Sequence, residues 1–96
     1  MYPLEEVLTW EAEMDDSLRQ ERQILAAYQW MKMDLADRRA VLLQEDAIDV
    51  FALDQVDQAI VRVEKLILER NVIIGEKEQA VRNMYRQWRE LLQNQQ

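Results

Sequence analysis

Side chains able to carry out enzyme chemistry are scarce in this sequence. It has no histidine or cysteine, and only Thr9 and Ser17 carry aliphatic hydroxyls, so nucleophile–base pairs and zinc sites lack their parts. A single glycine excludes a glycine-rich phosphate loop. Carboxylates are plentiful, but the usual di-iron bundle needs Glu-x-x-His on two helices. We therefore predict that the chain is not an enzyme and holds no metal or cofactor.

The charge of the chain points toward protein partners. Its 96 residues carry a net charge of −7, with 11 acidic and 5 basic side chains in residues 1–48 against 8 and 7 in residues 49–96. This sign disfavours nucleic acid and anionic membrane surfaces. The first residues do not resemble a signal peptide, no apolar run approaches a membrane span, and the lack of cysteine fits a reducing compartment. We expect a soluble, cytoplasmic protein.

Apolar residues recur at alternating spacings of three and four in two long stretches, which is the heptad spacing of packed helices and not the alternation of strands. The first stripe has four polar interruptions, whereas ten of the twelve positions of the second are apolar. The first stripe comprises Leu4, Val7, Glu11, Met14, Leu18, Glu21, Leu25, Tyr28, Lys32, Leu35, Arg39 and Leu42; the second comprises Leu53, Val56, Ile60, Val63, Ile67, Arg70, Ile74, Lys77, Val81, Met84, Trp88 and Leu91.

A short polar segment with two possible helix N-caps, Asp46 and Asp49, separates the stripes. Helices joined by so short a turn pack antiparallel. We predict an all-α fold, a long coiled-coil-like antiparallel two-helix hairpin. It forms one domain, 1–96, with helices over about 4–43 and 53–92 and a turn over about 44–52. Gly75 costs a helix about 1 kcal/mol, which leaves open a break there into three helices.

A turn centred near residue 48 places residues opposite each other when their numbers sum to about 96 or 97. The expected ion pairs are Glu11 with Arg86, Glu21 with Lys77 and Lys32 with Glu64. The same register gathers Trp10, Tyr85 and Trp88, with Leu91 and Leu92, at the end of the hairpin that holds the chain termini.

Near the middle of both stripes, further apolar residues lie on either side of the stripe, which is the seam where the two helices pack together. A single hairpin cannot bury the apolar residues on both flanks of this seam. Large exposed apolar patches usually mark an interface. Three explanations remain: homodimerisation into a four-helix bundle, binding of an amphipathic client helix, or burial by a third helix after Gly75. The residues that we predict for a client or dimer interface are Trp30, Met31, Met33, Val61, Leu68, Val72 and Ile73.

Two segments, residues 38–46 (RRAVLLQED) and 63–70 (VEKLILER), resemble the FlgN-type flagellar export chaperones. In that family an acidic first helix ends in a leucine-rich run, turns at an aspartate and resumes in a helix rich in Lys-Leu-Leu and Glu-Arg. The resemblance covers roughly residues 10–80. This chain ends soon after Leu92, whereas family members commonly continue into a client-binding C-terminal region.

The resemblance implies a cytoplasmic chaperone that holds the helical C-terminal segments of hook-filament junction subunits and delivers them to a type III export apparatus. The competing interpretation is a structural homodimeric bundle or adaptor subunit with no client cycle.

Overall fold

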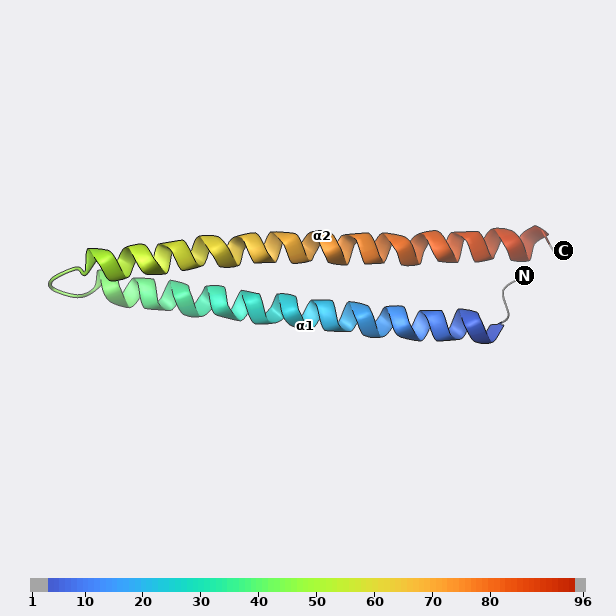
Figure 1. Cartoon of the computed structure of the whole chain (residues 1–96), viewed down its shortest axis with the longest axis horizontal. Coiled ribbons are helices and arrows are strands. Elements are labelled where there is room, and N and C mark those ends of the chain that lie inside the picture. The colour runs from blue at the N-terminus through green and yellow to red at the C-terminus, as the bar shows by residue number, and fades with distance from the viewer. Residues whose placement is uncertain (1–3, 95–96) are drawn as a thin grey trace. The chain divides into compact units, whose positions relative to one another are not determined.

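The structure is a computed structural model that describes residues 4–94, so residues 1–3 and 95–96 of the predicted domain lie outside it. Two helices, α1 (Leu4–Leu43) and α2 (Val50–Asn94), are joined by a short turn (Figure 1). Within residues 4–94 no strand is present. The predicted all-α helical hairpin is confirmed.

The bounds of α1 agree with the predicted 4–43. Glu5 and Glu6 lie in its first turn, where carboxylates favour the positive end of the helix dipole. At its other end the N–H of Gln44 donates to the carbonyl oxygen of Val41 at 3.1 Å, a tightened last turn. The apolar stripe therefore marks both ends of this helix.

The second helix begins at Val50, three residues before the predicted start at residue 53. Asp49 is its N-cap, because one carboxylate oxygen accepts a hydrogen bond of 3.0 Å from the N–H of Ala52. Its carbonyl oxygen accepts the first helical bond, from the N–H of Leu53 at 3.0 Å. Val50 and Phe51 are 74% and 73% exposed, so the first turn of α2 leaves no trace in the apolar stripe. Asp46, the other candidate cap, lies in the turn.

Gly75 does not interrupt α2, which continues through it to Asn94. The alternative of a break into three helices is therefore wrong. The glycine does not have positive φ, and a Cβ built on it would meet nothing within 4 Å. Neither backbone conformation nor crowding within the chain requires glycine at this position.

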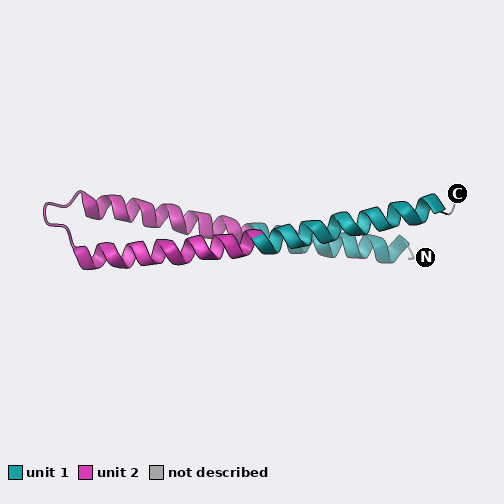
Figure 2. Cartoon of the chain, turned by 90° about the horizontal axis from the view of Figure 1, so that it is seen from above, with its two compact units in different colours: residues 1–22, 72–96 teal, residues 23–71 magenta. Residues whose placement is uncertain are grey.

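The contacts of the chain divide it into two compact units (Figure 2). Unit 1 contains residues 1–22 and 72–96, of which 4–22 and 72–94 are described, and unit 2 contains residues 23–71. In each unit a segment of α1 packs antiparallel against a segment of α2. The side chains that each unit buries belong to the predicted stripes: Leu18 and Ile74 in unit 1 and Val63 in unit 2.

Candidate functional site

Polar residues interrupt the apolar seam of α1 at four positions, and each of them has a partner on α2 within its own unit. The side chain of Lys77 lies 2.9 Å from Glu21, and Lys32 lies 3.6 Å from Glu64. Both of these ion pairs were predicted and are confirmed. The other two interruptions are Glu11, which pairs with Tyr85, and Arg39, which pairs with Asp57 at 2.7 Å.

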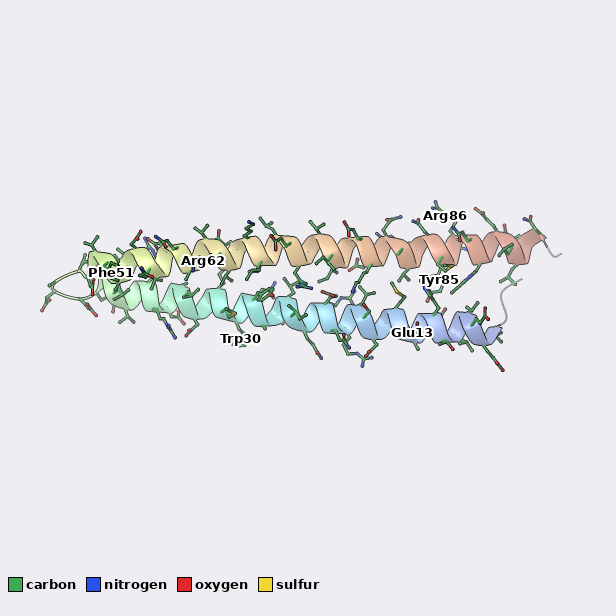
Figure 3. All side chains as sticks on the ribbon, in the orientation of Figure 1. Glu13, Trp30, Phe51, Arg62, Tyr85 and Arg86 are labelled. Carbon is green, nitrogen blue, oxygen red and sulfur yellow. The ribbon has the colours of Figure 1, made fainter. Side chains whose placement is uncertain are left out.

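The predicted pair of Glu11 with Arg86 is not formed. Arg86 projects from the side of α2 that faces away from α1 and donates to the side-chain oxygen of Asn83 at 2.9 Å (Figure 3). The hydroxyl of Tyr85, one residue earlier, donates to the carboxylate of Glu11 instead. This hydrogen bond, followed by burial and by the charges of Glu11 and Asp15, raises the pKa of Tyr85.

The aromatic residues of unit 1 form the predicted cluster. Trp88 contacts Trp10 and Tyr85 edge-on, with ring centroids 5.5 Å apart in both pairs, a geometry that adds to the burial of the rings. The indole Nε1 of Trp88 is buried without a hydrogen-bond partner. Leu91 and Leu92 are 43% and 65% exposed, so they add little to the cluster.

Unit 2 has an apolar groove along one flank of its helix pair. The groove encloses about 430 Å³. Met31, Leu35, Val63 and Leu66 form its apolar wall with Ala59, and its charged residues are Asp34, Arg38 and Arg62. Asp34 and Arg38 form an ion pair of 3.2 Å. Arg62 has no ion pair or hydrogen bond within residues 4–94.

The opposite flank of unit 2 is charged. Asp57 and Glu64 directly follow seam residues of α2, whereas Ala59 and Leu66 directly precede them, so the two sets lie on different sides of the seam. Asp57 and Glu64 hold the ion pairs with Arg39 and Lys32. Beside Ile60 and Val63, the flank with the groove is therefore apolar where the opposite flank is charged.

Of the seven residues predicted for the interface, only Met31 lines this groove. Four others of unit 2 are exposed outside it, and Trp30 points away from α2 (Figure 3). In unit 1, Val72 is 58% exposed and Ile73 is half-buried. The exposed fractions in unit 2 are 71% for Trp30, 48% for Met31, 59% for Met33, 65% for Val61 and 67% for Leu68.

The predicted set did not include Ala59, Arg38 or Arg62. A signal for this flank was present in the sequence, because small and apolar residues recur at every seventh position directly before the seam of α2. This repeat comprises Ala52, Ala59, Leu66, Ile73 and Ala80. The prediction instead took apolar residues from both flanks of the stripe.

No cluster of three or more acidic side chains in residues 4–94 could hold a metal ion. Neither helix, over its described length, contains a segment long and apolar enough to cross a membrane. No protein-family model, curated protein or solved structure matches this chain.

Proposed function

We propose that this protein is a non-enzymatic binding protein that holds an amphipathic helical segment of a client protein in the groove of unit 2. The observation that carries the proposal is the imbalance between buried and exposed apolar residues. Among residues 4–94 only Leu18, Val63 and Ile74 are buried, while large hydrophobic side chains such as Trp30 and Leu68 remain exposed. A chain with so small a core gains stability from a partner that covers the rest.

The accessible surface supports the same conclusion. The chain exposes 7630 Å², whereas a folded monomer of 11.6 kDa is expected to expose about 5,800 Å² from the usual scaling with mass. The excess is about twice the 800 Å² or so that one partner buries in a standard interface. The uncovered surface is therefore large enough for an interface of standard size.

The chemistry of the groove defines the client segment. Met31 and Leu66 offer flexible apolar side chains near the surface, 48% and 36% exposed, above the deeper Leu35 and Val63. A helix with apolar residues at i, i+3 or i+4, and i+7 lays such a stripe into a groove of this kind. Arg62, which has no partner in the described chain, favours a client that carries a carboxylate beside its apolar stripe.

The narrower assignment, a cytoplasmic chaperone of flagellar or type III export, is supported by the resemblance of residues 38–46 and 63–70 to FlgN-type chaperones. On this proposal the client is the helical C-terminal segment of a hook-filament junction protein. The protein would protect that segment until export, and the function needs no catalytic residue.

A structural homodimer is the second candidate, and the groove itself favours it in one respect. Its walls carry both signs of charge, with Asp34 on α1 and Arg62 on α2. A two-fold axis along the groove that set Asp34 of one copy against Arg62 of the other would make the interface self-complementary, as isologous interfaces are. The groove would then be the seam of a four-helix bundle.

The two candidates differ in oligomeric state. Light scattering coupled to size-exclusion chromatography, over a concentration series, measures the mass of the purified chain. A monomer, or a dimer that dissociates on dilution, leaves the groove open and supports the client-binding function. A dimer whose mass does not change with concentration assigns the groove to a second copy and contradicts that function.

Client binding is tested directly by calorimetric titration with a peptide from the helical C-terminal segment of a hook-filament junction protein. We expect Leu66→Glu, in the groove, to weaken binding at least tenfold because it places a charge against the client's apolar stripe. Leu68→Glu, two residues away at an exposed position outside the groove, is the matched control and should bind as the original protein does. Loss of binding in Leu68→Glu alone would show that the client binds the exposed side of α2 that carries Leu68, and not the groove.

A further inference from the structure

Unit 1 carries a basic surface that the proposed function does not use. Arg82, Arg86 and Arg89 are exposed on α2, and no acidic residue occurs between Gln79 and Arg89. Together with Gln79, Asn83 and Tyr85 they line a shallow hollow of about 440 Å³. Since the whole chain has a net charge of −7, a surface with three cations and no anion differs from its surroundings.

Side-chain amides orient these arginines without neutralising them. Arg82 donates to the side-chain oxygen of Gln79 at 2.9 Å, and Arg86 donates to that of Asn83 at 2.9 Å. Gln79 and Asn83 are themselves joined by a hydrogen bond of 3.0 Å. The result is a network of neutral acceptors that holds two guanidinium groups in place while their positive charges remain.

The carboxylates nearby compensate this charge only in part. On α1, Glu11 and Asp15 lie near Tyr85, which lines the same hollow, and Glu11 is engaged by the tyrosine hydroxyl. Glu78 approaches Arg82 only at 4.0 Å and also pairs with Arg22 of α1 at 3.3 Å. Arg89 makes no ion pair or hydrogen bond within the described chain. The helix dipole does not account for the cluster either, because the last turn of α2 contains no basic residue and the dipole acts only over that turn.

We propose that Arg82, Arg86 and Arg89 form a docking surface for an acidic helical segment of a partner protein. The three residues are spaced at i, i+4 and i+7 and span about 10 Å along α2 at 1.5 Å per residue. A helix that carries Glu or Asp at the same spacing presents three carboxylates over the same length. Guanidinium groups suit this partner, because they bind carboxylates with paired N–H donors.

A nucleic acid is the less favoured anion. The acidic α1 and the net charge of the chain repel an extended phosphate backbone, whose binding depends on long-range attraction. A short acidic helix needs attraction only over the local surface. This proposal uses residues of unit 1 alone and does not depend on the groove of unit 2.

The test uses the full chain and a fluorescein-labelled, alanine-based helical peptide with Glu at i, i+4 and i+7, followed by fluorescence anisotropy. The comparison peptide has Gln at the three positions. We expect the Glu peptide to bind more tightly at about 50 mM salt, and its affinity to fall as salt screens the charges. Equal affinity for the two peptides would overturn the proposal.

The matched variants are Arg86→Gln/Arg89→Gln and Arg19→Gln/Lys65→Gln, which remove the same charge from different surfaces. We expect the first to weaken binding of the Glu peptide about tenfold and the second less than twofold. Equal losses would show a general effect of net charge and overturn the proposal. Tighter binding of a labelled single-stranded RNA than of the Glu peptide, or salt-sensitive self-association without peptide binding, would also overturn it.

Discussion

The ammonium group of Lys77 lies 2.9 Å from a carboxylate oxygen of Glu21 and 2.7 Å from the hydroxyl of Ser17, so one side chain of α2 joins two successive turns of α1. The side chains of Lys77 and Glu21 are only 31% and 14% exposed, against 48% and 49% for the Lys32–Glu64 pair. Ion pairs lose strength when water screens them. The Lys77–Glu21 contact is therefore the more protected of the two predicted pairs.

We expect Lys77→Met to lower the free energy of unfolding by about 1 kcal/mol, because it removes two charge-assisted hydrogen bonds from a half-buried position. Lys32→Met, the matched control in unit 2, should change it by less than about 0.5 kcal/mol. Urea unfolding followed by circular dichroism measures both values. Equal effects of the two variants would show that the difference in exposure does not matter here.

The hydrogen bond from Tyr85 to Glu11 predicts a dependence of stability on high pH. The pKa of Tyr85 is raised in the folded state, so its neutral form stabilises the fold fully below about pH 10, the ordinary pKa of tyrosine. That stabilisation is lost as the pH rises through the folded-state pKa. We expect the phenolate absorbance of Tyr85 to appear at higher pH than that of a free tyrosine.

A variant with Tyr2→Phe and Tyr28→Phe leaves Tyr85 as the only tyrosine for this titration. Adding Glu11→Ala should shift the midpoint back toward that of a free tyrosine, because it removes both the acceptor and its charge, and with them the largest cause of the raised pKa. An unchanged midpoint would mean that Glu11 does not hold the tyrosine hydroxyl.

The sequence offers two aspartates as the N-cap of α2, and the structure shows which of them caps the helix. Asp49 bonds the N–H of Ala52, whereas Asp46 lies in the turn. Asp49→Ala should therefore lower the free energy of unfolding by about 1 kcal/mol, and Asp46→Ala should leave it nearly unchanged. The comparison is best made by thermal unfolding at a fixed protein concentration. A larger loss for Asp46→Ala would place the start of α2 earlier in the chain.

Much of the fold was predictable, because the seam follows directly from heptad spacing. Alternating spacings of three and four identify the buried side, and Val63 and Ile74 are among its members. The spacing does not report the start of α2, since the cap is a local hydrogen bond and Val50 and Phe51 contribute nothing to the seam. The heptad spacing of apolar residues predicts only those turns of a helix whose side chains become buried.

The candidate site was less predictable, because exposed apolar residues do not indicate which of them share a surface. Val61 and Leu68 were predicted because they are apolar and lie beside the stripe; they are exposed outside the groove, whereas Ala59 lines it. The register error at Arg86 has a similar origin. The expectation that opposing residues have a constant sum of residue numbers is accurate only to about one position. A shift of one position along a helix turns the side chain by about 100°, which is enough to point it away from the other helix.

Gly75 provides the clearest test of whether the surface of α2 is covered by a partner. Its Cβ would meet nothing within 4 Å in this chain, and its φ is not positive. Gly75→Ala should therefore stabilise an isolated hairpin by about 1 kcal/mol and raise its midpoint of thermal unfolding by about 4–8 °C. Ala80→Gly, at another exposed helical position, is the control and should have the opposite effect. Destabilisation by Gly75→Ala would instead indicate that another chain packs closely against this glycine, and dilution should then abolish the effect.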